Sequence, residues 1–166
     1  MEGLIDFMLN LLNGLNKDLT IFIISMIPIL ELRGGMIAAS VLGVPYVRAL
    51  ILCIIGNIIP IPFILLFINK IFEWLKSFRF TRGIVLKLEN RAMGKSDKIQ
   101  KYEFLGILLF VGIPLPGTGA WTGSLIASLL RIKLRKAVPA VFLGILMAAA
   151  IMSFIAYAIP YIVMNF

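Results

Sequence analysis

The sequence predicts an all-α integral membrane protein built from two inverted repeats, each a re-entrant helical hairpin followed by a transmembrane helix, plus a basic cytoplasmic interfacial helix. Three observations predict this fold. Of 166 residues, 61% are hydrophobic and 14% are charged, and the mean hydropathy is +1.04, far outside the range of soluble domains. Proline and glycine clusters interrupt the apolar runs, and the cations are concentrated in two stretches. A single membrane domain, 1–166, accommodates all of these segments.

The amino-terminal half contains three predicted elements. Segment 1–18 has apolar residues at helical spacing but is too short to span a bilayer, which predicts an interfacial helix; a terminal helix without a role fits the pattern equally well. The chain is then almost continuously apolar to residue 68, and Gly43-Val44-Pro45 divides this run. We therefore predict a re-entrant hairpin over 19–43 and a transmembrane helix over 46–68.

Segment 69–103 is hydrophilic and contains nine Lys and Arg against four Asp and Glu. This bias predicts a cytoplasmic location. Its apolar residues recur at helical spacing, so part of the segment should lie along the lipid headgroups. A surface helix without a ligand is favoured here over specific lipid recognition.

The carboxyl-terminal half repeats the pattern of an interrupted apolar run and a turn. Segment 104–130 is apolar and is broken by GIPLPGTGAWTG at 112–123, which contains two prolines and four glycines. The uncharged segment 137–164 is predicted to be a transmembrane helix. Four cations precede it and are predicted to contact lipid headgroups: Arg131, Lys133, Arg135 and Lys136.

The placement of those cations predicts that 104–130 does not cross the membrane. A single crossing would carry the four cations outside, against the positive-inside bias. A re-entrant hairpin over 104–130 keeps them in the cytoplasm with 69–103, and its broken backbone then forms the tip of the hairpin. The prediction is a multi-pass protein of the cell (plasma) membrane with both termini outside.

An internal repeat supports this arrangement. Sliding the chain on itself by 88 residues aligns 28–56 with 116–144 and gives seven identities over 29 positions. One span separates the two hairpins, so the second repeat is inverted and the two tips should meet near the membrane midplane. The identities are Pro28 with Pro116, Gly35 with Gly123, Ala39 with Ala127, Ser40 with Ser128, Leu42 with Leu130, Ala49 with Ala137, and Gly56 with Gly144.

Glu31 and Arg33 are the strongest candidates for function, because an unpaired charge at membrane depth is costly. A carboxyl group in an apolar cavity can exchange a proton, and an arginine suits an anionic group such as phosphate. The alternatives are a structural ion pair, or Glu31 pinning the broken backbone of the second hairpin. The other candidates for a substrate or ion path are Pro28, Gly34, Gly35, Asn57, Pro114, Pro116, Gly117, Thr118, Gly119, Trp121 and Thr122.

Two of these candidates have structural alternatives. Trp121 could line a cavity or fill the space left by the glycines, and Asn57 could face the cavity or make a helix–helix hydrogen bond. The chain has no histidine and a single cysteine, Cys53, so we expect no enzyme activity, no metal and no cofactor. The cations flank apolar segments and alternate with acids, so we expect no nucleic-acid partner. Two spans and two hairpins enclose little sealed interior, which favours a homodimer.

The tip Glu31–Gly35, ELRGG, together with Pro114–Gly123, PLPGTGAWTG, resembles the small multidrug export protein family of bacteria and archaea over about 21–161. That family is similar to the DedA membrane proteins, a resemblance that implies two opposed re-entrant hairpins and links to undecaprenyl phosphate flipping and lipid scrambling. Glu31, Arg33 and Pro114–Gly117 are the residues that carry over as transport residues. The chain departs from DedA proteins at Thr118, where an acid often stands, and in having both charges in the first hairpin.

The predicted function is a membrane transporter or lipid flippase, coupled to protons or cations, that moves an anionic lipid-phosphate or a small amphiphile through the opposed hairpins. Its expected partners are membrane lipids, the substrate, and protons or cations. A non-transporting, membrane-organising protein that binds anionic lipid or a partner through 69–103 is the alternative. Drug efflux is a weaker form of the transport hypothesis, since drug sites are usually larger.

Overall fold

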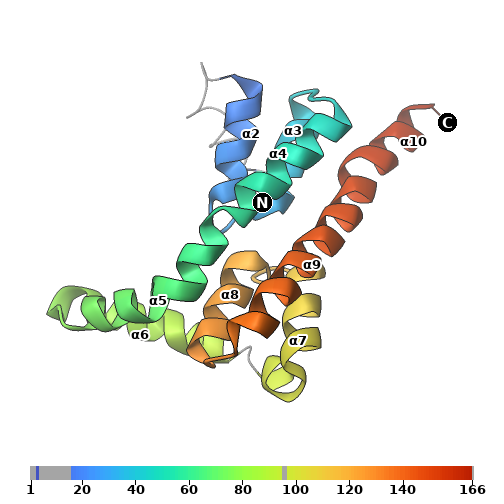
Figure 1. Ribbon diagram of the computed structural model, residues 1–166. Helices are drawn as coiled ribbons and strands as arrows, with labels where there is room; N and C mark the ends of the chain where they lie inside the picture. Colours follow the sequence, from blue (N-terminus) through green and yellow to red (C-terminus); the bar gives the residue numbers. More distant parts are fainter. Residues whose placement is uncertain (1–2, 4–15, 95–96, 166) are drawn as a thin grey trace.

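The computed structural model describes residues 3, 16–94 and 97–165, and within these ranges the regular structure is entirely helical. The predicted interfacial helix over 1–18 falls almost wholly outside the described residues. The helices are α2 (Lys17–Met26), α3 (Glu31–Val41), α4 (Tyr46–Ile58), α5 (Pro60–Lys76), α6 (Arg79–Met93), α7 (Asp97–Gly112), α8 (Ala120–Leu129), α9 (Leu134–Ser153), the π-helix η1 (Phe154–Ala158) and α10 (Ile159–Asn165) (Figure 1).

Two long apolar helices form the framework. Helices α4 and α5 join into a helix of 31 residues, Tyr46–Lys76, and α9, η1 and α10 join into one of 30 residues, Leu134–Val163. Both are long and apolar enough to cross a bilayer. Within their most apolar windows only 33% and 39% of residues are buried, and Phe63 on α5 is 64% exposed. An apolar surface of this extent is typical of helices that face lipid.

The first long helix extends further than the sequence predicts. The expected end was residue 68, whereas α5 continues to Lys76. The prolines that punctuate this run do not end the helix, because Pro60 is the first residue of α5, where the missing N–H costs little. The beginning of the predicted cytoplasmic segment is therefore part of this helix.

Each predicted hairpin is a helix, a loop and a helix. Helices α2 and α3 are joined by residues 27–30, and α7 and α8 by residues 113–119. Helix α7 is kinked at Glu103, where φ is 28° and ψ is −86°. The arm that packs beside α8 and α9 thus starts close to the predicted boundary at 104.

The 88-residue spacing of the sequence repeat recurs in the backbone. Helix α4 begins at Tyr46 and α9 at Leu134, and the turns before them contain left-handed residues at Gly43 (φ 67°) and Arg131 (φ 52°). The two turns therefore have the same conformation. Three corresponding hydrogen bonds close each turn. In the first turn they run from Leu42 N to Ala38 O (2.9 Å), from Gly43 N to Ser40 O (3.1 Å) and from Val44 N to Ala39 O (2.9 Å). In the second turn they run from Leu130 N to Ile126 O (2.9 Å), from Arg131 N to Ser128 O (3.0 Å) and from Ile132 N to Ala127 O (2.9 Å).

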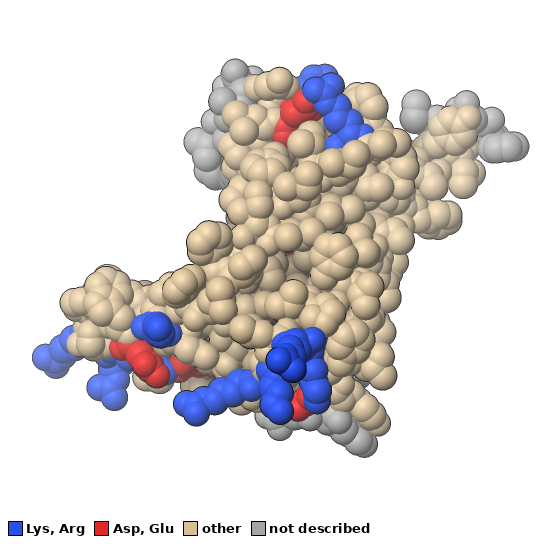
Figure 2. Space-filling view, viewed as in Figure 1, with Lys and Arg blue, Asp and Glu red and all other residues tan. Residues whose placement is uncertain are grey.

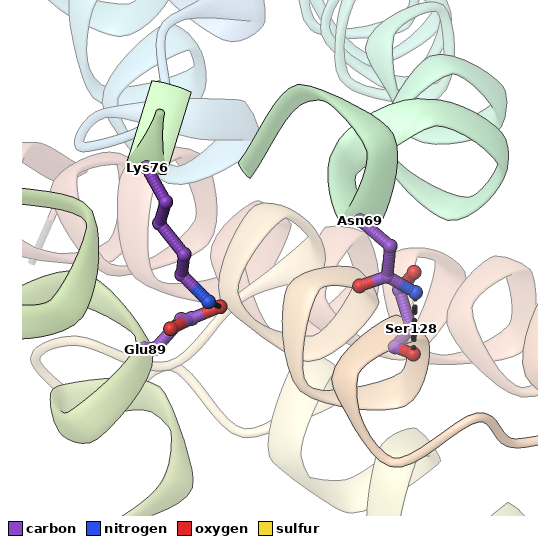
Figure 3. A network of polar contacts seen from close by, with 4 residues as sticks. All are labelled: Asn69, Lys76, Glu89 and Ser128. Carbon is purple, nitrogen blue, oxygen red and sulfur yellow. Dashed lines mark hydrogen bonds and ion pairs between the residues drawn. The ribbon is translucent and has the colours of Figure 1, made fainter. Parts of the chain in front are cut away.

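Each hairpin is attached to the long helix of the other half. In the first, Ser40 Oγ donates to the carbonyl of Ala156 at 2.6 Å. In the second, Ser128 Oγ donates to the carbonyl of Leu65 at 3.5 Å, and Asn69 Nδ2 donates to the carbonyl of Ser128 at 3.0 Å (Figure 3). These hydrogen bonds join each hairpin to the opposite half of the chain and hold the two halves together.

The basic residues gather at one end of the molecule. Helix α6 folds back along α5, to which it is tied by a Lys76–Glu89 ion pair of 2.5 Å (Figure 3). The α8–α9 turn lies at the same end as α6 (Figure 1), and Lys and Arg side chains cover that end (Figure 2). The start of α4, with an Arg48–Asp18 ion pair, lies at the opposite end.

Candidate functional site

The two hairpin loops are joined by Glu31, the first residue of α3. Its side chain is buried, with 4% of the residue exposed. The N–H of Ala120 donates to Oε2 at 2.9 Å and the N–H of Trp121 donates to Oε1 at 3.1 Å. These are the first residues of α8, whose N–H groups have no partner within the helix. The Glu31 carboxylate therefore caps α8 at its positive end.

The backbone at this contact requires a glycine. Gly119 has φ 140°, a conformation that L side chains rarely adopt. A Cβ atom at Gly119 would also overlap the Glu31 carboxylate. Glu31 itself has φ 51°, which costs a non-glycine residue about 1–2 kcal/mol. Glu31 is thus kept in a strained conformation by the bonds to α8.

Arg33 contacts the other side of the helix break in the second hairpin, at the end of α7. It is half-buried and lies in the first turn of α3, and its guanidinium group points at the end of α7 and the loop that follows. The planar guanidinium has five donors and can serve several carbonyl groups at once. It donates to the carbonyls of Leu115 (2.8 Å), Ile113 (3.1 Å), Thr118 (3.1 Å) and Val111 (3.2 Å), and to Thr118 Oγ1 (3.0 Å).

One hairpin thus supplies charges to both ends of the break in the other. The carboxylate of Glu31 meets the amino end of α8, and the guanidinium of Arg33 meets the carboxyl end of α7. Each charge has the sign that the helix dipole favours. Among the described residues Glu31 and Arg33 form no ion pair with each other. Of the sequence-based alternatives, the structure shows Glu31 holding the broken backbone of the second hairpin.

Two further predicted residues complete the contact. Thr118 Oγ1 accepts from the N–H of Leu115 at 3.3 Å and lies 2.9 Å from the carbonyl of the same residue, which folds the loop on itself. Trp121 Nε1 donates to the carbonyl of Met26 at 3.1 Å, at the end of α2. Trp121 therefore joins the two hairpins, and Thr122 follows it, half-buried, on α8.

The glycines of the first tip have a packing role. Gly34 and Gly35 are both buried on α3. A Cβ atom at Gly35 would overlap Ser25 on α2 and come within 2.9 Å of the Cys53 sulfur on α4. The glycine thus allows three helices to approach one another. The prolines of the two loops lie where the loops are exposed or half-exposed: Pro28, Pro114 and Pro116.

The structure does not bring Asn57 into hydrogen-bond contact with either loop. Asn57 lies on α4 with 2% of its surface exposed, and Oδ1 has no hydrogen-bond partner in the described part of the chain. Ser124 Oγ on α8 is likewise buried without a partner there. The predicted helix–helix hydrogen bond is therefore not formed at Asn57 Oδ1.

Sequence reasoning missed the residues that meet Arg33 and Trp121 through their backbones. Val111, Ile113, Leu115 and Met26 are apolar and contribute carbonyl oxygens. Every residue has such an oxygen, so no residue type signals it. The only available signal was the helix break, which implies unpaired carbonyls nearby.

The four cations predicted to contact lipid headgroups differ in their surroundings. Lys136 forms an ion pair with Glu103. Arg131, Lys133 and Arg135 are exposed, and within the described ranges their side chains form no hydrogen bond or ion pair. These three remain available to a ligand.

A sequence model of the family described as "Putative small multi-drug export protein" matches residues 31–151. The chain belongs to this family. The range matched to the small multi-drug export family begins at Glu31 and contains Arg33, the second loop, all of the first long helix and the second long helix as far as residue 151. Membership and the two apolar helices together indicate a membrane protein of the transport class. The comparison bears on this family alone, so the DedA resemblance stays a prediction. No curated protein and no solved structure matched the chain.

Proposed function

We propose that the protein is a plasma-membrane transporter in which two opposed re-entrant hairpins close on each other through Glu31 and Arg33. One observation carries this proposal: two charged residues of one hairpin occupy both ends of the helix break in the other. Broken helices that present their ends to a ligand are typical of transporters. Hydrogen bonds at such a break can be exchanged for bonds to a ligand, so the contact can open and close.

The proposed arrangement in the membrane has the second half inverted relative to the first. The turns at Gly43 and Arg131 have the same backbone but lie at opposite ends of the molecule (Figure 1). One long helix separates the hairpins, and the basic end contains both cationic stretches (Figure 2). The positive-inside rule puts that end in the cytoplasm. The start of α2 and the end of α10, at the other end, are then outside.

The proposed coupling uses the carboxylate of Glu31. Hydrogen bonds from N–H groups to an ionised carboxylate are about twice as strong as neutral ones. Protonation, or a bound cation, weakens the bonds from Ala120 and Trp121 and frees the amino end of α8. The anionic group of a substrate then competes for the same N–H groups. In this structure Glu31 occupies these N–H groups, so carboxylate and substrate alternate there.

The substrate class that fits is an anionic lipid-phosphate or a small amphiphile, tested in proteoliposomes. The probes are fluorescent phosphatidylglycerol, quenched by external dithionite, and ethidium, each with and without a pH gradient. We expect Glu31→Gln and Arg33→Lys to slow movement of the transported probe at least tenfold, following the loss of two or more charged hydrogen bonds. Asp18→Asn and Arg48→Gln make matched changes at an exposed ion pair and should leave transport intact.

Two results would overturn the transporter proposal. The first is full activity of both Glu31→Gln and Arg33→Lys. The second is movement of neither probe by the unmodified protein. Folding of each variant is checked by its thermal melting in detergent.

Labelling of engineered thiols tests the inverted arrangement. Val47 and Arg135 are 88 residues apart and both exposed, and Cys53 is buried and can be replaced by alanine to provide the background. A membrane-impermeant maleimide should label Val47→Cys from outside and Arg135→Cys from inside only. Labelling of both from the same side would exclude the inverted arrangement.

A different observation supports a second candidate function. The end of α5 and helix α6 project from the body (Figure 1), and this projection exposes Trp74 (63%) and Phe80 (88%) among basic residues. Aromatic and basic side chains together suit the headgroup region. A membrane-organising protein would lose its effect in cells on neutralisation of Arg79, Arg82 and Lys87, and would be insensitive to Glu31→Gln.

A further inference from the structure

A lipid-facing groove separates the two long helices. Its volume is about 250 Å³, and it is lined by aliphatic and aromatic side chains, among them Ile61, Leu65 and Leu66 on α5 and Leu134, Val138 and Phe142 on α9. An apolar cavity of about 150 Å³ already excludes water and binds benzene. The groove is therefore suited to a section of an alkyl chain.

Three unpaired cations adjoin one end of this groove. Leu134 is both a groove residue and the first residue of α9. Lys133 and Arg135 flank it in the chain, and Arg131 lies in the preceding turn. All three are exposed. Lys136, the fourth cation of the stretch, is neutralised by Glu103.

The turn does not need these three cations to fold. The corresponding turn, 88 residues earlier, contains Gly43, Pro45 and Val47 at the same positions, with the same backbone hydrogen bonds. Only the fourth cation has a counterpart: Arg48 pairs with Asp18 as Lys136 pairs with Glu103. The unpaired cations are thus an addition to a turn that already has its structural ion pair.

A second groove, of about 280 Å³, lies beside the corresponding turn of the first half. It is lined by residues of α3 and the η1 region, including Ser40, Val41 and Ile155, and the turn that follows Val41, at 42–45, contains no cation. Of these two grooves, the α5–α9 groove is therefore the one that a cation-rich turn adjoins.

We propose that the α5–α9 groove and the Arg131–Arg135 turn bind one anionic phospholipid of the surrounding membrane. An acyl chain lies in the groove, and the phosphate is bound by Arg131, Lys133 and Arg135 near the amino end of α9, where the helix dipole favours an anion. The lipid is a bound component on the outer face of the long helices. This site is separate from the hairpin loops, so the proposal goes beyond the transport function.

Native mass spectrometry of the full chain in a non-ionic detergent tests the site. The probes are dioleoyl phosphatidylglycerol and dioleoyl phosphatidylcholine at equal concentration. We expect one phosphatidylglycerol to be retained in preference to phosphatidylcholine. The triple change Arg131→Gln, Lys133→Gln and Arg135→Gln should weaken its binding about 100-fold, from the usual contribution of a basic residue near an anionic lipid.

The matched control removes the same number of positive charges from another part of the basic end. Arg79→Gln, Arg82→Gln and Lys87→Gln on α6 should leave phosphatidylglycerol binding within about twofold of the unmodified protein, because α6 does not line the groove. Equal binding by the two triple variants, or equal loss in both, would overturn the site. Should the first triple variant fail to fold, NaCl titration of the unmodified protein replaces it: binding insensitive to salt contradicts the proposal.

A separate variant and a competing ligand test whether an acyl chain lies in the groove. Val138→Trp fills the groove and should weaken phosphatidylglycerol binding at least tenfold, whereas glycerol 3-phosphate, which has the headgroup chemistry but no chain, should not displace the lipid. Unchanged binding by Val138→Trp, or displacement by millimolar glycerol 3-phosphate, would show that no chain occupies the groove.

Discussion

The turns before α4 and α9 have the same backbone and different chemistry. Gly43 and Arg131 are both left-handed, at φ 67° and 52°, and corresponding hydrogen bonds close each turn. Glycine adopts this conformation at no steric cost, whereas arginine does so at about 1–2 kcal/mol. Helix-end hydrogen bonding therefore determines the shape of the turn. The side chains are then free to distinguish the two ends of the molecule.

The two hairpins differ in a more consequential way. The first has a short loop, 27–30, and contributes Glu31 and Arg33; the second has a longer loop, 113–119, and contributes helix ends and carbonyl groups. The halves are related in sequence but complementary at their contact. A mutation at this contact should therefore be far more harmful than one at either turn.

The largest effect is expected at Gly119, which lies against the Glu31 carboxylate of the first hairpin. Gly119→Ala places a Cβ against the Glu31 carboxylate in a conformation that only glycine adopts readily. We expect a loss of about 4 kcal/mol of unfolding free energy, measured by SDS titration in mixed micelles. The control is Gly83→Ala on α6, where an added Cβ has no atom within 4 Å. Equal stability of the two variants would mean that the hairpins do not meet at Gly119.

A smaller but substantial loss is expected at Arg33. Arg33→Gln leaves the carbonyls at the end of α7 without their donors, at a cost of about 3 kcal/mol, measured by the same titration. The exposed Arg48→Gln removes a surface ion pair and should cost less than about 1 kcal/mol. If the two changes cost the same, Arg33 does not support the second hairpin.

Substitutions at the two left-handed residues test whether the two turns are equivalent. Gly43→Ala meets no atom within 4 Å, so its cost of about 1 kcal/mol comes from backbone strain alone. Arg131→Gly relieves the same strain and should stabilise the protein by up to about 1 kcal/mol, after the entropy that glycine adds to the unfolded chain. Melting temperatures in a zwitterionic detergent should move in opposite directions. A shift of both in the same direction contradicts the equivalence of the turns.

The smallest effects concern the two corresponding ion pairs. Double-mutant cycles on Asp18 with Arg48 and on Glu103 with Lys136 should each give a coupling of about 0.2–1 kcal/mol, because the cations are more than half exposed. Raising NaCl to 1 M should reduce both couplings. A coupling well above this range at one pair alone would show that the two ends are stabilised differently.

The class of protein and the approximate positions of its breaks follow from the amino-acid sequence. Composition indicated a membrane protein, the proline and glycine cluster at 112–123 located the second loop, and the 88-residue repeat related the turns at Gly43 and Arg131. The first loop, 27–30, precedes the glycines of the predicted tip, because Gly34 and Gly35 lie within α3. The sequence also singled out Glu31 and Arg33, because a charge in an apolar run needs a compensating partner. The first long helix continues to Lys76, past the predicted boundary at residue 68, because that boundary was placed where hydrophilic residues begin, and polar residues do not by themselves end a helix.

The groups that those charges contact became known only from the packed structure. The partners of Glu31 and Arg33 are main-chain groups of the second hairpin, and Trp121 reaches the carbonyl of Met26. Asn57, a further polar candidate, makes no hydrogen bond with either loop in the described part of the chain. The physical reason is that every residue has an N–H or a carbonyl group, so a bond to the backbone leaves no pattern in the sequence. The choice between an ion pair and two capped helix ends depends on the packing of distant segments.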